Sequence, residues 1–328
     1  MWASAPTGSK PSNRPVSRPR TTTGSAPLDY RQARAGVAFG TAAYVWWGLC
    51  ALYFKALAVA GVPPVQVLAH RIGWSFVLLV LIVAWTRRFA ELRAVLRQPR
   101  VLGRLCLTTL LIANNWGIFI YAVTTGELLQ ASLGYFINPL LNVLLGVVFL
   151  RERLRPTQTL AVLLATVAVG WMVMRYGQVP WIALILAASF GFYGLIRKTA
   201  PVGPILGLTI ETGLLAPAAV VYLLYCDQQG SGCFLHGGFL LDLLLASAGL
   251  ITALPLIWFT AAAKRLRYAT LGFLQYLAPT GQFLLAVLAF GEPFTRQHAV
   301  TFGLIWIALA IYSAETIVHA RRRATAVR

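Results

Sequence analysis

The chain has 328 residues, of which 58% are hydrophobic and only 11% are charged. A soluble domain is usually about a quarter charged, and its polar residues could not cover this much apolar surface. The composition therefore excludes an ordinary soluble protein and favours an integral membrane protein. The formal net charge of +19 does not indicate nucleic-acid binding, because the basic residues stand in short clusters between apolar runs.

The N-terminal region, residues 1–35, is rich in proline, serine, threonine and arginine and contains no apolar signal-peptide core. It cannot bury enough apolar surface to fold alone, so we predict a disordered basic tail. The first apolar run after it would act as an uncleaved anchor. A second basic tail is expected at residues 319–328.

Ten apolar segments follow that reach the length of about 20 residues needed to cross a bilayer. They are 36–60, 65–86, 101–123, 127–150, 157–175, 179–197, 203–225, 239–263, 269–290 and 297–318. The loops between them are short. We therefore expect an all-α integral membrane fold with ten transmembrane helices.

Lysine and arginine are distributed unevenly between the loops. Most of the 28 basic residues lie in the two tails and in every second loop, whereas the other loops carry only Arg175 and Arg296. Basic residues mark the cytoplasmic side of a membrane protein. Both termini are thus predicted in the cytoplasm of a bacterial cell, with the protein in the inner membrane. Topology and contact with lipid headgroups account for these clusters.

An internal repeat is visible when the two halves are aligned. The stretch YAVTTGELLQAS (121–132) matches FTAAAKRLRYAT (259–270), and the prolines Pro139 and Pro279 align soon afterwards. Thirteen residues beyond each proline stands a glutamate, Glu152 or Glu292.

The repeat unit would contain five helices, an odd number, so the two copies must cross the membrane in opposite directions. We predict two inverted five-helix repeats, at residues 36–175 and 176–318. Inverted repeats around a midplane site are typical of secondary transporters. A duplication kept only for packing is the alternative.

Charged groups inside the predicted helices are functional candidates, because a charge at membrane depth needs a partner or a role. Lys55 and Arg71 lie near the outer ends of the first two helices and could attract an anionic or carboxylate-bearing substrate. For Lys55, extension to the interface is an equal alternative. Glu211, in the seventh helix, could pair with Arg71 or bind a proton for coupling. A purely structural ion pair is its alternative role.

Polar and aromatic groups at depth are further candidates for a substrate cavity. The third helix contains Asn115 and Trp116 in an apolar run, with Tyr121 toward its outer end. The first helix contains Tyr44 and Trp47. Aromatic cavity walls suit flat or amphipathic organic molecules, although ordinary helix packing would also explain each ring.

The two aligned prolines are expected to kink their helices. Pro139 and Pro279 would free the carbonyl groups of Tyr135 and Gln275 four residues earlier. The side chains of Asn138 and Gln275 could add polarity at this depth. We therefore include both in the candidate cavity.

The cysteines and known motifs offer little chemistry. Cys226 and Cys233 share one loop outside the cytoplasm, where they could form a disulfide. The sequence contains no CxxC or zinc pattern, P-loop, nucleophile triad or HExxH motif. We predict no metal, no cofactor and no enzymatic activity.

Four stretches resemble a known family. YVWWGLCALYFKAL, LAHRIGWS, NNWGIFIYAV and LLQASLGYFINPLLNVLLGVVFLRERL are similar to the RarD proteins, in the EamA branch of the drug/metabolite transporter (DMT) superfamily. The resemblance spans residues 36–318. It implies ten helices in two repeats, cytoplasmic termini and transport of small organic molecules, mostly outward.

The sequence thus supports one main hypothesis, a secondary active exporter of a metabolite or drug that is coupled to protons and works by alternating access. Its expected partners are a small-molecule substrate, protons and the lipid bilayer, without nucleic acid. Formation of a homodimer stays open. The alternative hypothesis is an integral-membrane enzyme or a scaffold that transports nothing.

Overall fold

The computed structural model describes residues 30–125, 127–289 and 296–325, and the regular elements in these ranges are α-helices. In chain order they are α1 (Tyr30–Val59), α2 (Pro64–Trp85), α3 (Phe89–Leu96), α4 (Pro99–Thr124), α5 (Leu128–Val148), α6 (Pro156–Tyr176), α7 (Trp181–Thr199), α8 (Pro204–Gln228), α9 (Phe239–Arg265), α10 (Tyr268–Gln275), α11 (Leu277–Leu288) and α12 (Arg296–Thr325). Within the described ranges, nine are long and apolar enough to span a bilayer. The protein is an all-helical, multi-pass membrane protein.

The predicted segment 269–290 is divided in the structure. Helix α10 ends at Gln275 and α11 begins at Leu277, two residues before Pro279. The proline has no N–H that could bond to the carbonyl of Gln275, which explains a break at this point. Residue 290 lies outside the described part of the chain. By contrast, α5 runs through Pro139 without interruption. The count of ten crossings therefore stays a prediction.

The helices extend beyond the predicted membrane segments at both ends of the chain. Helix α1 begins at Tyr30, so residues 30–35 are helical and not part of a disordered tail, while α12 continues through the predicted tail to Thr325. Alanine and arginine have high helix propensity and prolong a helix beyond the lipid. The remaining tail residues, 1–29 and 326–328, lie outside the described residues.

Helix α3 was not predicted, because its eight residues are too few to give a membrane signal. Its Leu92 and Val95 pack beside a buried cluster that includes Val83. At its start, the Arg88 guanidinium donates to the Glu91 carboxylate, with 2.7 Å between Nη2 and Oε2. This hydrogen bond lowers the pKa of Glu91 below its ordinary value.

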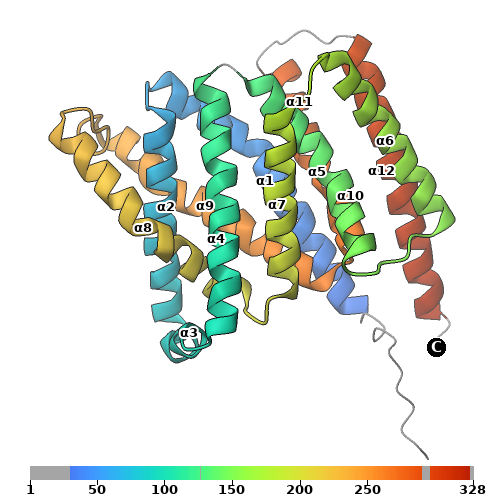
Figure 1. Cartoon of the computed structure of the whole chain (residues 1–328), viewed down its shortest axis with the longest axis horizontal. Coiled ribbons are helices and arrows are strands. Elements are labelled where there is room, and N and C mark those ends of the chain that lie inside the picture. Colours follow the sequence, from blue (N-terminus) through green and yellow to red (C-terminus); the bar gives the residue numbers. More distant parts are fainter. Residues whose placement is uncertain (1–29, 126, 290–295, 326–328) are drawn as a thin grey trace, which may run out of the picture.

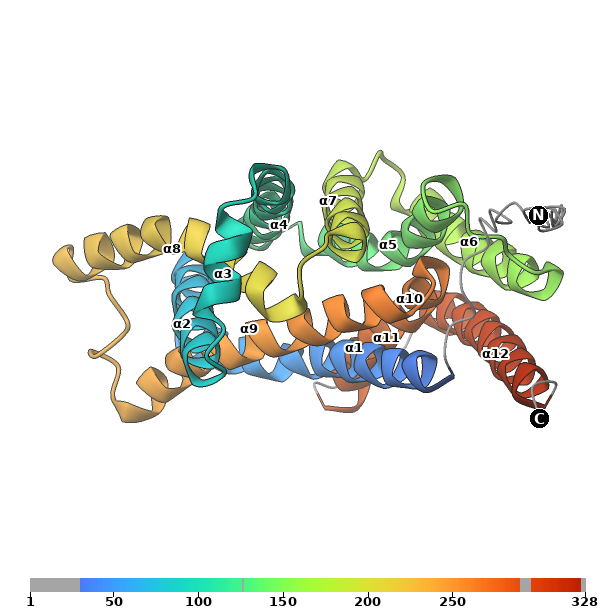
Figure 2. The same cartoon turned by 90° about the horizontal axis from the view of Figure 1, so that it is seen from below.

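The helices form two layers, which Figure 2 shows from below. In one layer α7 packs between α4 and α5, and in the other α1 packs against α9 and α11. The pair α2 and α8 lies at one end of the layers and the pair α6 and α12 at the other. The layers meet where α5 crosses α10 and where α7 contacts α9.

Each layer mixes the two halves of the chain. Helix α7 belongs to the second half but lies between two helices of the first, and α1 lies among helices of the second half. Exchanging α1 with α7, α4 with α9, and α5 with α10 and α11 converts one layer into the other. An inverted repeat would produce this packing, and the repeat itself stays a prediction.

The two faces of the molecule differ in charge. In Figure 1, α2 and α7 end at the lower edge, where α4 and α8 begin. The loops and helix ends at this edge carry most basic residues of the described chain, including Arg87, Arg100, Arg151, Lys198 and Lys264. We call this face the basic side and the other face the opposite side.

Helices α2 and α9 cross at unusually short distance because Gly249 has no side chain. A Cβ atom at Gly249 would lie 2.5 Å from the backbone carbonyl of Trp74. The Ser75 hydroxyl donates to the Gly249 carbonyl at 3.2 Å. Small residues commonly allow such close approach between membrane helices.

Replacing Gly249 by alanine should therefore force α2 and α9 apart and lower stability by about 1–3 kcal/mol. The matched control is Gly73→Ala on α2, where an added Cβ would have no neighbour within 4 Å. Thermal unfolding of the two purified variants in detergent measures the difference. Equal stability of both variants would contradict the close crossing.

Candidate functional site

Arg71 follows Pro64, the first residue of α2, by seven residues. It therefore lies about 10 Å along the helix from the end of α2 at the opposite side. Its Nε donates to the Thr252 hydroxyl at 2.9 Å. The guanidinium lies 5.1 Å from the ring centre of Phe54 and 5.3 Å from that of Trp116. Four helices, α1, α2, α4 and α9, thus converge on one cation.

Arg71 and Glu211 do not pair, which corrects one of the two sequence-based options. Among the described residues, no carboxylate lies within 4.0 Å of the Arg71 guanidinium. Lys55 is exposed near the end of α1. Its predicted role beside Arg71 stays a prediction.

Glu211 pairs instead with Arg197 of α7, one of the basic residues near a helix end. The two ions are 3.5 Å apart between Nε and Oε1, and the side chains are 0% and 1% exposed. The Thr108 hydroxyl donates to Glu211 at 2.6 Å and the Tyr193 hydroxyl at 3.3 Å. Gly207 leaves the space that the guanidinium occupies.

Two lysines connect the ends of α7 and α9 at the basic side, and we call this arrangement the lysine clasp. Lys198 of α7 donates to the carbonyls of Ala263, at 2.7 Å, and Leu266 at the end of α9. Lys264 of α9 donates to the Ala200 carbonyl after α7, at 2.5 Å. Each ammonium thus binds the negative end of the other helix.

Glu152 binds the start of a third helix, α10, at the basic side. Its carboxylate accepts the backbone N–H groups of Tyr268 at 2.6 Å and Ala269 at 3.0 Å, at the start of α10. A carboxylate there compensates the positive end of the helix. The aligned residue, Glu292, lies outside the described residues.

The middle of the molecule contains a chain of amides where α5 crosses α10. Asn138 donates to the Ala187 carbonyl of α7 at 2.7 Å. Asn142, which is not among the predicted site residues, donates to Asn138 at 3.0 Å and to Gln275 at 2.8 Å. The predicted polar residues Asn138 and Gln275 therefore meet, but through buried Asn142 and not in an open space.

An aromatic cluster lies between the layers near the same depth. Tyr44 is 0% exposed, and its ring lies 5.6 Å from Trp47 and 6.4 Å from Phe259. Phe190 lies 5.8 Å from Trp47 and 5.1 Å from Phe259. These rings fill the space between α1, α7 and α9, so Tyr44 is a packed residue and does not line a cavity.

The remaining candidates divide between the interior and the surface. Asn115 donates to the Leu186 carbonyl and the Ser189 hydroxyl of α7, both at 2.9 Å. Tyr121 is exposed beside Trp181. The predicted disulfide is absent, because Cys226 and Cys233 are free thiols.

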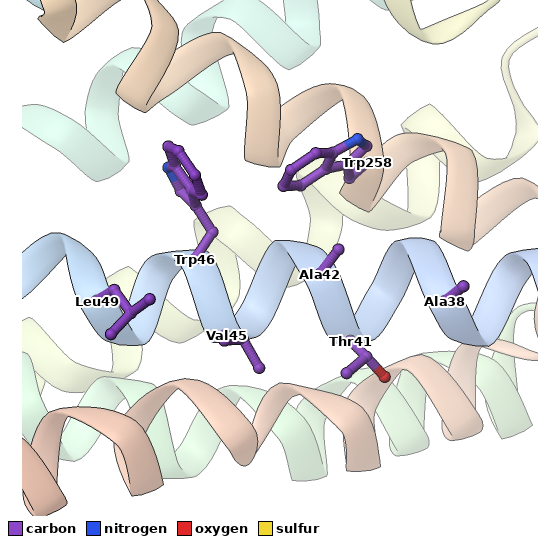
Figure 3. A pocket seen from close by; sticks show the side chains of 7 residues that line it. All are labelled: Ala38, Thr41, Ala42, Val45, Trp46, Leu49 and Trp258. Atoms are coloured by element: carbon purple, nitrogen blue, oxygen red, sulfur yellow. The ribbon is translucent and has the colours of Figure 1, made fainter.

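A surface groove lies on the outer face of α1 (Figure 3). Its lining is Ala38, Thr41, Ala42, Val45, Trp46, Leu49 and Trp258, and its volume is about 540 Å³. The groove is shallow and its lining is almost wholly apolar, so it suits lipid chains better than a polar substrate. The groove includes none of the predicted site residues.

Comparisons with known proteins agree with the fold. The EamA-like transporter family matches residues 34–174. An uncharacterized transporter of Vibrio cholerae is 46% identical over 90% of this chain and 98% of its own. Protein RarD of Escherichia coli is 44% identical over 90% of this chain and 99% of its own. This chain belongs to the RarD group of the EamA family.

A solved structure that is 21% identical covers 86% of this chain and 98% of its own, with a TM-score of 0.64. That likeness concerns the fold alone. Membership in the EamA family makes this protein a membrane transporter. The family assignment leaves the roles of the individual residues open, so these follow as proposals.

Replacing Arg197 by methionine should destabilise the protein by roughly 3–5 kcal/mol, because the buried Glu211 carboxylate loses its counter-charge. The double variant with Glu211→Gln removes both charges and should recover most of that loss. Thermal unfolding in detergent measures both.

The matched control is Arg155→Met, because Arg155 pairs with Glu315 at 3.3 Å in a partly exposed position. Its loss should stay below about 1 kcal/mol. A double variant as unstable as Arg197→Met would contradict the pairing.

Proposed function

We propose that this EamA family member is a secondary active exporter of small organic molecules, driven by the proton gradient through alternating access. The observation that carries this is an asymmetry between the two sides. The basic side is held together by the lysine clasp and by Glu211 with its partner Arg197, whereas Arg71 near the opposite side has no carboxylate within 4.0 Å among the described residues.

The basic side is taken as cytoplasmic, because lysine and arginine concentrate there. Both described ends of the chain, the start of α1 and the end of α12, lie at this edge in Figure 1. We therefore place the protein in a bacterial inner membrane with cytoplasmic termini. The substrate path would be closed toward the cytoplasm in this state.

The packing of the corresponding helices supports a state closed at one side. Helix α7 packs against α9 near the basic side, and the lysine clasp joins their ends. The corresponding helices, α1 and α4, have little direct packing in the described chain. Breaking one contact and forming the other would exchange the closed side, as two inverted repeats allow.

Glu211 is the candidate for proton coupling. Its carboxylate accepts hydrogen bonds from Thr108 of α4 and Tyr193 of α7 and pairs with Arg197. Adding a proton would neutralise the carboxylate and remove its attraction to Arg197. The contact between α4, α7 and α8 would then weaken, which links protonation to opening of the basic side.

Glu211→Gln imitates the protonated state, so net transport driven by a pH gradient should fall to background. Exchange of labelled for unlabelled substrate across the membrane should persist, because it needs no net proton movement. Reconstituted vesicles loaded with a panel of metabolites and drugs, with and without a proton gradient, measure both fluxes. The control is Glu91→Gln on exposed α3, and unchanged gradient-driven flux in Glu211→Gln would contradict coupling.

Replacing Lys198 and Lys264 together by methionine should remove the clasp and open the basic side. Spin labels on cysteines at Thr199 and Arg265 should then show a longer distance. A second pair at Lys55 and Thr125, on the opposite side, should show a shorter one. The labels require prior replacement of the four native cysteines, and unchanged distances in both pairs would contradict the gate.

A further inference from the structure

We propose that Arg71 binds the carboxylate of the transported molecule, so that the substrates are small organic anions with an aromatic or apolar body. This inference rests on the proposed transport function and names its substrate class. Three observations carry it: the missing counter-charge, the free hydrogen-bonding capacity of the guanidinium and the aromatic surroundings.

Within the described part of the chain, the lack of a neighbouring carboxylate sets the partly buried Arg71 apart from the fully buried Arg197. Arg197 has Glu211 within 3.5 Å. For Arg71, the electrostatic neighbours in the described chain are the phenols of Tyr53 and Tyr135 and the thiol of Cys50, all of which are neutral in their ordinary state. A charge at this depth is costly unless an anion accompanies it.

Cation–π contacts do not remove this need. The contacts with Phe54 and Trp116 stabilise the guanidinium less than the loss of hydration destabilises it. An anionic substrate would supply the remaining stabilisation of the guanidinium when it enters. The site is thus complete only with a negative ligand.

The guanidinium of Arg71 also has N–H donors that bond to no described residue. Its Nε donates to Thr252, and no hydrogen bond to another described residue is formed by the two Nη groups. A planar guanidinium with free Nη groups matches the two oxygens of a carboxylate. Thr252 therefore orients the side chain and leaves its outer edge available.

The side chains around Arg71 determine which chemical groups the rest of the ligand can carry. Phe54 on α1 and Thr252 on α9 belong to one layer, while Trp116 on α4 and Tyr135 on α5 belong to the other. These two helix pairs have little direct packing against each other in the described chain. Tyr135 remains 38% exposed although α4, α7 and α10 pack around its helix. Rings of this kind favour contact with a flat apolar body.

The test compares three probes of the same shape: 3-phenylpropionate, its amide and 3-phenylpropylamine. Binding to the purified protein in phosphatidylcholine nanodiscs is measured by displacement of radiolabelled 3-phenylpropionate. The acid should bind roughly tenfold to a hundredfold more tightly than the amide, and the amine should not bind. Arg71→Gln should abolish the preference for the acid, whereas Arg71→Lys should keep part of it.

The matched control is Arg175→Gln, because Arg175 also lies over an aromatic ring, Trp171 at 4.7 Å, but on the exposed face of α6. It should bind the acid as the wild type does. A preference for the acid that survives in Arg71→Gln would overturn the proposal, as would equal affinity for acid and amide. Nanodiscs with added phosphatidylglycerol form a further arm. Complete displacement of the acid by this lipid would assign Arg71 to a headgroup and also overturn the proposal.

Transport measured in reconstituted vesicles distinguishes failure of the proposed anion site from failure of the proposed transport function. Flux of neutral or cationic compounds without any carboxylate preference would reject the anion site but keep the transporter. Absence of flux for every compound in the panel, together with intact binding of 3-phenylpropionate, would reject the proposed function but keep the site. Flux of the acid that disappears in Arg71→Gln supports both.

Discussion

The ion pair between Arg197 and Glu211 is the contact on which the basic side of the molecule depends. Both side chains are almost completely removed from solvent, so neither charge is tolerable without the other. The pair joins α7 to α8, and Thr108 adds α4. A helix of the second half is thereby held in the layer of the first, and Lys198, the residue directly after Arg197, forms part of the lysine clasp.

The two halves place opposite charges at corresponding positions. Arg71 and Glu211 each stand seven residues after the proline that begins α2 or α8. Arg71 donates a hydrogen bond to Thr252 of α9, and Glu211 accepts one from Thr108 of α4. A permanent cation is suited to holding an anion, and an acid is suited to exchanging a proton. The chemistry of the two sides thus differs although their architecture corresponds.

The sequence predicted the long apolar helices but not the short helix α3 or the side-chain partners of the buried charges. Apolar run length identifies a membrane helix because lipid thickness fixes how many residues it needs. Helix α3, with eight residues, lies below that limit. The pairing of Arg197 could not be read from its position among other basic residues at a helix end. Gly207, one turn before Glu211, was the only local sign, because its missing side chain makes room for a guanidinium.

A charge at membrane depth constrains its surroundings more strongly than an aromatic ring does. A ring at depth packs equally well against protein or against a ligand, as Tyr44 illustrates in the filled cluster between α1, α7 and α9. A charge has no such freedom, because it must be neutralised wherever it lies. Arg71, without a carboxylate of the described chain beside it, therefore directs attention to a partner from outside the protein, and Glu211 to one within it.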